Sequence, residues 1–159
     1  MQNYREKNYQ SDGFNRNQQK QGFSGGSYQE REEIPRPSKG EYQSKWITSS
    51  VDNSLVDYAE KAGKFMAKKG LTNSKIRSIY GEIKRIQMSE FEKEKSAFIL
   101  LKPKMAYALG RDANNEGLKL FKEIFDLSSS NVTDQKSFQN FCNFMEAILA
   151  YHKANGGKD

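Results

Sequence analysis

The sequence contains few of the residues from which disulfide scaffolds and metal centres are built. Its 159 residues include one cysteine, Cys142, and one histidine, His152. A single cysteine cannot form a disulfide within the chain, and one cysteine with one histidine cannot supply the ligands of a structural zinc site. We therefore expect no disulfide framework, no metal and no other cofactor.

Long apolar runs are also missing. Apolar residues make up 35% of the chain, and no stretch approaches the roughly 20 consecutive apolar residues of a membrane span. The N-terminus has no apolar segment of the kind found in secretory signals. These absences predict a cytoplasmic protein with no membrane partner.

The sequence has none of the common catalytic patterns. The glycines near charged residues, at 110 and at 156–157, do not have the spacing of a phosphate-binding loop. No second histidine stands near His152 to share a metal, and Cys142 lies on the same helical stripe as Phe138, as a small core residue does. The sequence thus predicts that the protein is not an enzyme, and that His152 is packed in the core or at an interface.

Residues 1–45 differ in composition from the rest of the chain. Apart from Met1 and Ile34 they hold almost no aliphatic side chains, and their aromatic residues stand singly among Gln, Asn, Gly, Ser and Arg. Such a segment cannot bury enough apolar surface to offset the entropy lost on ordering. We interpret it as a disordered tail, either solvated without a specific role or able to stack weakly on bases or self-associate. The folded domain is predicted to span residues 46–159, beginning near Trp46.

From residue 46 onward the apolar residues recur at helical spacing. Gly70 is expected to end the first helix and Thr72 or Ser74 to cap the second. Pro103 removes a backbone donor and should kink or divide the third. No long stretch alternates with period two, so we predict an all-α fold, a compact bundle of about five helices around a common core. The predicted helices cover residues 51–66, 74–86, 91–108, 118–125 and 138–152.

Basic charge is concentrated in the second and third of these helices. The chain has 26 Lys and Arg against 20 Asp and Glu, a net charge of +6. Residues 75–111 alone hold nine basic and four acidic residues. Arg77 and Lys84 are seven residues apart and share a helix face, as do Lys104 and Arg111. Such rows of cations favour an anionic partner.

Two interpretations of this charge remain open. A row of cations along a helix can follow the phosphate backbone of a nucleic acid without reading its sequence. Lysines and arginines are also common on solvated helix faces, and the alternation of Lys93 and Lys95 with Glu92 and Glu94 is typical of such a face. Charge alone does not decide between them.

Several short motifs follow one another along the chain. They are Ser-Lys-Ile-Arg at 74–77, Lys-Pro-Lys-Met-Ala-Tyr at 102–107, Gly-Arg at 110–111, Phe-Met-Glu-Ala-Ile at 144–148, and Ala-Tyr-His-Lys at 150–153 before the double glycine at 156–157. Their order and spacing, from about Leu55 to Asp159, resemble the small subunit of the type III-A CRISPR effector, the Csm complex. Residues 1–45 lie outside the resemblance.

The resemblance implies a small, helical, non-catalytic protein that acts in antiviral defence. In that family several copies stack side by side along the duplex of CRISPR RNA and target RNA. The implied partners are therefore both RNAs, copies of the chain itself, the backbone subunit and the large polymerase-like subunit. Because such a subunit serves any guide sequence, it must hold sugar and phosphate rather than bases.

The resemblance also implies which residues face RNA. The RNA-binding positions implied by the matched motifs are Lys75, Arg77, Lys102, Lys104, Tyr107 and Arg111. Helical geometry alone adds Lys84 and Arg85 to these positions.

An alternative hypothesis is that the protein is a helical assembly adaptor whose basic surface serves a protein partner.

Overall fold

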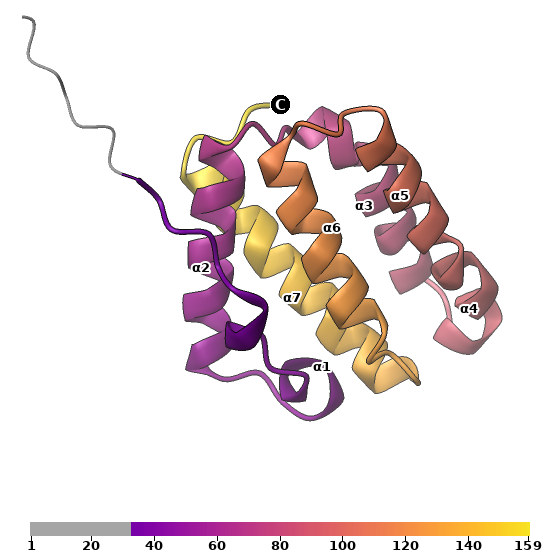
Figure 1. Cartoon of the computed structure of the whole chain (residues 1–159). Coiled ribbons are helices and arrows are strands. Elements are labelled where there is room, and N and C mark those ends of the chain that lie inside the picture. The colour runs from indigo at the N-terminus through magenta and orange to yellow at the C-terminus, as the bar shows by residue number, and fades with distance from the viewer. Residues whose placement is uncertain (1–32) are drawn as a thin grey trace, which may run out of the picture. The chain divides into compact units, whose positions relative to one another are not determined.

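In the computed structural model, which describes residues 33–159, every regular element is helical (Figure 1). The described part of the chain contains no strand, although Thr72 and Lys158 form an isolated parallel bridge. No helix in this part is long and apolar enough to cross a membrane. The predicted all-α fold is confirmed. The elements are the 3-10 helix η1 (Lys39–Glu41) and the helices α1 (Lys45–Thr48), α2 (Asn53–Lys68), α3 (Asn73–Gln87), α4 (Phe91–Ile99), α5 (Leu101–Gly110), α6 (Glu116–Ser129) and α7 (Gln135–Ala154).

Four of the predicted helices correspond to α2, α3, α6 and α7. The third is divided into α4 and α5, which meet at Leu100. Pro103 lies in the first turn of α5, where its missing N–H would have no helical partner in any case. Gly70 and Gly156 follow the ends of α2 and α7 with φ of +87° and +82°, a backbone conformation that favours glycine. The short helix α1 was not predicted, because four residues are too few to show a period.

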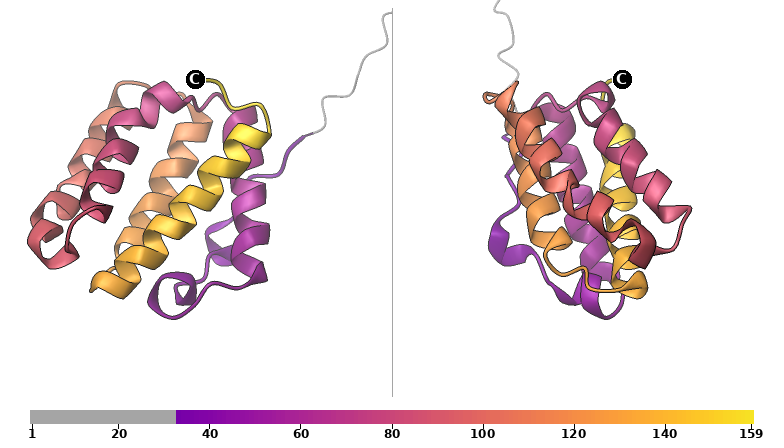
Figure 2. Two further views of the ribbon diagram at one scale, coloured as in Figure 1. Left: turned by 180° about the vertical axis from the view of Figure 1, so that it is seen from behind. Right: turned by 90° about the vertical axis from the view of Figure 1, so that its right-hand side faces the viewer.

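Helix α7 is the central element of the bundle. It packs against α1, α2, α3, α4 and α6. The front and back views show α2 on one side of it, with α3, α4 and α5 on the other (Figures 1 and 2). Side chains on several sides of α7 are buried, which is possible only for a helix surrounded by others. These buried residues include Phe138, Phe141, Cys142, Phe144, Met145, Ile148 and His152.

Two groups of aromatic rings fasten the outer helices to α7. At one group, Phe144 lies 5.7 Å from Trp46 of α1 and 6.1 Å from Tyr58 of α2, measured between ring centroids. At the other, Phe138 stacks on Phe91 of α4 at 4.9 Å. Phe98, Phe125 and Phe141 complete the second group in edge-to-face contacts. Such pairs add to the hydrophobic gain of burying the rings.

Residues 33–45 belong to the folded unit rather than to the tail. Tyr42 packs edge-on against Trp46 with a centroid separation of 5.6 Å, and its hydroxyl accepts a hydrogen bond from Asn131. Arg36 pairs with Glu123 of α6 at 3.3 Å. The predicted domain start at residue 46 is therefore corrected to about residue 33. Composition misled here because few but well-placed apolar contacts suffice to dock a segment. The remainder of the predicted disordered tail, residues 1–32, lies outside the described residues.

Helices α2 and α7 approach each other closely at Gly63. A side chain carbon built on Gly63 would lie 2.6 Å from the backbone nitrogen of His152 and 2.8 Å from the backbone oxygen of Ile148. His152 is fully buried beside this contact, and its Nε2 lies 2.9 Å from the backbone oxygen of Leu71. The helix crossing thus depends on a residue with no side chain.

Replacing Gly63 tests this contact. Gly63→Ala is expected to lower the free energy of unfolding by about 1–3 kcal/mol, because the added methyl group meets backbone atoms that cannot turn aside. The matched control is Gly81→Ala in α3, where no atom lies within 4 Å of the new carbon; it should raise the same free energy by about 0.5–1 kcal/mol. Urea unfolding followed by circular dichroism measures both. A Gly63→Ala protein as stable as the parent would contradict the close packing.

Truncation tests the corrected boundary. A chain beginning at Trp46 loses the Tyr42 and Arg36 contacts, and we expect its melting temperature to fall by at least about 4 °C relative to a chain beginning at Glu33. Both lack the same residues 1–32, so the difference reports on residues 33–45 alone. Equal melting temperatures would restore the boundary at residue 46.

Candidate functional site

A groove of about 1040 Å³ runs between α3 and α5, and we call it the α3–α5 groove. Four cationic and two acidic side chains line it, together with two serines and an apolar floor. The α3 wall carries Ser74, Lys75, Arg77, Ser78, Ile79, Gly81 and Glu82, and the other wall carries Leu100, Pro103, Lys104, Tyr107, Ala108, Arg111, Asp112 and Leu118.

The helical periods of α3 and α5 decide which side chains reach the groove. Lys104, Tyr107 and Arg111 follow one another at intervals of three and four, so they project from one face of α5 and its C-cap. Leu101 and Met105 lie on the adjoining face and are fully buried. Each helix therefore anchors itself in the core with one face and presents polar side chains to the groove with the face beside it.

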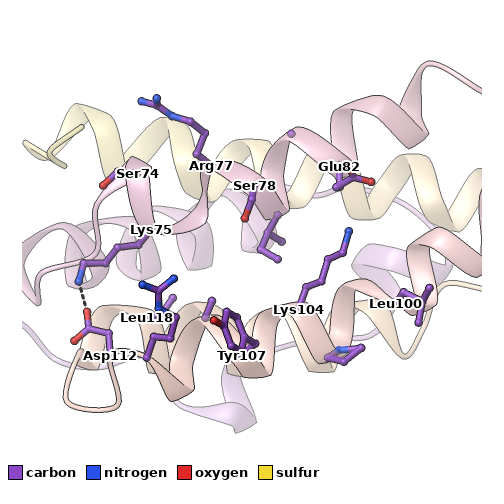
Figure 3. Close-up of a pocket in the computed structure, with 15 residues that line it drawn as sticks. Ser74, Lys75, Arg77, Ser78, Glu82, Leu100, Lys104, Tyr107, Asp112 and Leu118 are labelled. Atoms are coloured by element: carbon purple, nitrogen blue, oxygen red, sulfur yellow. Dashed lines mark hydrogen bonds and ion pairs between the residues drawn. The ribbon is translucent and has the colours of Figure 1, made fainter.

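Lys75 is neutralised within the groove. Its ammonium pairs with the carboxylate of Asp112, which also accepts a hydrogen bond of 3.1 Å from Asn115 (Figure 3). The hydrogen bond from Lys75 is the largest cause that lowers the pKa of Asp112 below its usual range. The acid therefore stays ionised at neutral pH, and Lys75 is engaged when the groove is empty.

Arg77, Lys104 and Arg111 have no such partner. No carboxylate among residues 33–159 lies within ion-pairing distance of any of the three. In Figure 3 the Lys104 side chain extends from α5 toward α3, whereas that of Arg77 extends from α3 on the side away from α5. Lys104 and Arg111, unpaired at the groove, and Arg77 beside it make this surface attractive to a polyanion.

An exposed aromatic ring stands among these cations. Tyr107 leaves 68% of its surface to solvent, and the guanidinium carbon of Arg111 lies 5.8 Å from its ring centroid. That separation is within the range of a cation–π contact. The groove thus combines positive charge with an accessible π face.

Three predicted RNA-binding residues lie outside the groove. Lys84 pairs with Glu146 of α7 at 3.0 Å, and this hydrogen bond is the largest cause that raises the pKa of Lys84. The guanidinium of Arg85 donates hydrogen bonds to Glu94 and Glu82. Both raise the pKa of Arg85, and Glu94 has the larger effect.

The third residue, Lys102, donates a hydrogen bond of 3.0 Å to Ser130. Lys75, Arg77, Lys104, Tyr107 and Arg111 are therefore the predicted positions that the structure brings together.

The sequence analysis did not identify Asp112 or Glu82 as part of this site. Asp112 directly follows Arg111, and an acid beside the last residue of a basic cluster is the signal that could have revealed it. Glu82 lies on α3, four residues after Ser78, at helical spacing along the groove. Both reduce the positive charge of the groove.

The chemically reactive side chains lie in the core. Burial raises the pKa of the Cys142 thiol to about 12, so the thiol stays protonated. His152 is closed off by Gly157, where even one added carbon would collide with the imidazole ring. No three His, Cys, Asp or Glu side chains of the described residues are placed to share a metal ion.

Comparisons with known proteins place these features in a family context. The family model described as Csm2 Type III-A matches residues 49–158. The chain is 32% identical over 121 residues to the CRISPR system Cms protein Csm2 of Streptococcus thermophilus, covering 69% of this chain and 97% of that protein. No solved structure matches the chain significantly.

Removing the acid tests its hold on Lys75. Asp112→Asn frees the ammonium, and we expect affinity for single-stranded RNA at low salt to rise by up to about fivefold. The slope of log affinity against log salt should steepen by up to about 0.7. Asp126→Asn is the control, because it removes the same charge from an ion pair with Lys122 on α6. Equal changes in both variants would mean that net charge alone acts.

Proposed function

This chain belongs to the type III-A Csm2 family, and from that premise we propose that its α3–α5 groove binds the RNA backbone within a type III-A CRISPR complex. The family identifies the chain as a small subunit of the Csm complex. The observation that carries the proposal is that Lys104 and Arg111 line one groove, with Arg77 beside it on α3, and that none of the three has a carboxylate within ion-pairing distance among residues 33–159.

Backbone binding suits the chemistry of this groove. Guanidinium and ammonium groups bind phosphate oxygens, whereas sequence is read by hydrogen bonds to base edges. A subunit that accompanies any guide must avoid such readout, and cations supplied by two fixed helix faces meet that need. The partners in this proposal are the CRISPR RNA and the target RNA.

The same proposal gives the chain an architectural role. Several copies stack along the duplex of CRISPR RNA and target RNA and contact the backbone subunit and the large polymerase-like subunit. The chain itself performs no catalysis in this scheme. The buried, protonated Cys142 and the enclosed His152 support that assignment, since neither can reach a substrate.

A fourfold substitution tests the RNA-binding groove. Replacing Lys75, Arg77, Lys104 and Arg111 with alanine is expected to weaken binding to single-stranded RNA at low salt by at least about tenfold, because the phosphate contacts are lost. The salt slope should fall by up to roughly 3, at about 0.7 for each lost contact. Fluorescence polarisation across a salt series measures both, and circular dichroism should show unchanged helicity.

A second fourfold variant is the control. It replaces four exposed lysines that pair with nearby acids outside the groove, and so removes the same total charge. We expect it to keep most of the RNA affinity. Unaltered binding in the groove variant, or equal loss in both, would contradict the site. The control residues are Lys61, Lys93, Lys95 and Lys119.

The alternative function is a helical adaptor that uses the same surface for a protein partner. Ile99 and Leu100 favour it, since both are more than half exposed where α4 meets α5, and Leu100 lines the groove. Two binding measurements separate the two functions. RNA affinity no greater than that for an unrelated polyanion, together with tight binding to another Csm subunit that the groove variant loses, would establish the adaptor.

A further inference from the structure

Tyr107 is the feature of the groove that backbone binding does not explain. Its helix buries Leu101 and Met105 completely, yet leaves this large ring 68% exposed. Exposing an aromatic ring to water forgoes the hydrophobic gain of burying it. Phosphate contacts by neighbouring cations require no such ring, so Tyr107 calls for a ligand with an apolar, flat surface.

We propose that Tyr107 is a stacking platform for an unpaired RNA base, with Lys104 and Arg111 holding the phosphates beside that nucleotide. This inference rests on the proposed function of the α3–α5 groove and names the form of RNA that the groove takes. Stacking a base on an aromatic ring is tolerant of sequence, since every base has a π face. A subunit that serves any guide can therefore use it.

The arrangement around the ring fits this role. The Arg111 guanidinium lies 5.8 Å from the ring centroid, and the high exposure of Tyr107 leaves ring surface accessible to a ligand. Lys104 precedes the tyrosine by three residues and lines the same groove, so a cation flanks the ring on either side along the helix. A nucleotide presents the same combination, a flat base joined to phosphates.

Ser78 lines the groove on the opposite wall. A hydroxyl both donates and accepts hydrogen bonds, so it can meet a sugar or a base edge without demanding one base.

Only an unpaired base can use this platform. Inside a continuous duplex both faces of each base are covered by its neighbours, and the wide minor groove of A-form RNA offers edges and hydroxyls rather than ring faces. A free base face is available in a single strand and in a nucleotide extruded from a duplex. These two sources share one chemistry, and the RNAs used in the experiment distinguish them.

The experiment compares four RNAs with the full-length protein. They are a single strand, the same strand with abasic residues, a perfect duplex, and that duplex with one unpaired nucleotide. Fluorescence polarisation gives each affinity for the unaltered protein and for Tyr107→Ala, Tyr107→Phe and Tyr80→Ala. Tyr80 is the matched control, because it too lies beside a cation, with the Lys84 ammonium 5.5 Å from its ring centroid, but does not line the groove.

We expect Tyr107→Ala to lose affinity only for the RNAs that present an unpaired base. Tyr107→Ala should bind the single strand about 5- to 150-fold more weakly, while Tyr107→Phe and Tyr80→Ala stay within about threefold of the unaltered protein. The abasic strand should bind all four proteins equally. Selective loss on the single strand or on the duplex with one unpaired nucleotide identifies which source the platform uses, and either supports the proposal.

Three outcomes overturn it in distinguishable ways. If the unaltered protein binds abasic and ordinary strands equally, or if Tyr107→Ala binds both as the parent does, the base does not stack and backbone binding stands. If Tyr107→Ala weakens both strands equally, the ring acts by holding Arg111 in place. If the unaltered protein binds none of the RNAs, the proposed function itself fails. Thermal melting of each variant establishes that it is folded.

Discussion

The packing of α7 is the constraint on which the rest of the structure depends. Its aromatic side chains meet Trp46 and Tyr58 at one group and Phe91 at the other, so the helices of both sides are placed relative to one buried axis. The crossing with α2 is possible only because Gly63 lets the two backbones approach. Once α1, α2 and α4 have packed against α7, the other helices can bury their apolar faces in only a few arrangements.

The groove is a product of that arrangement rather than an independent feature. The isoleucine face of α3 and the Leu101–Met105 face of α5 are both packed in the core, and the faces beside them border the groove. The positions of the charged residues on α3 and α5 are therefore fixed by the buried contacts of the same two helices. A surface built in this way places its cations without needing rigid lysine or arginine side chains, whose ordering would cost conformational entropy.

Much of the fold could be predicted from periodicity, because apolar residues at helical spacing reflect burial on one face. The isoleucines of α3 and the phenylalanines of α7 show this directly. The packing of residues 33–45 could not be predicted, since a ring contact between Tyr42 and Trp46 and an ion pair between distant segments leave no local pattern in the sequence. At the site, spacing found Lys104, Tyr107 and Arg111 together. Spacing grouped Lys84 with these residues although Lys84 lies outside the groove and pairs with Glu146, because a helical period does not say which face meets α7. Spacing missed Asp112 because a turn brings that acid to Lys75.

The contact between α7 and the segment that follows α2 also bears on how the protein folds. The hydrogen bond between Leu71 and His152 joins residues 81 positions apart in the chain. Closing so long a loop loses entropy before the contacts across it can form, and folding rates fall as the contacts become less local. Helices α3, α4 and α5, in contrast, are neighbours both in sequence and in space. We therefore expect α3, α4 and α5, which carry the groove, to assemble early, and α7, whose contacts with α1 and α2 are far apart in sequence, to dock late.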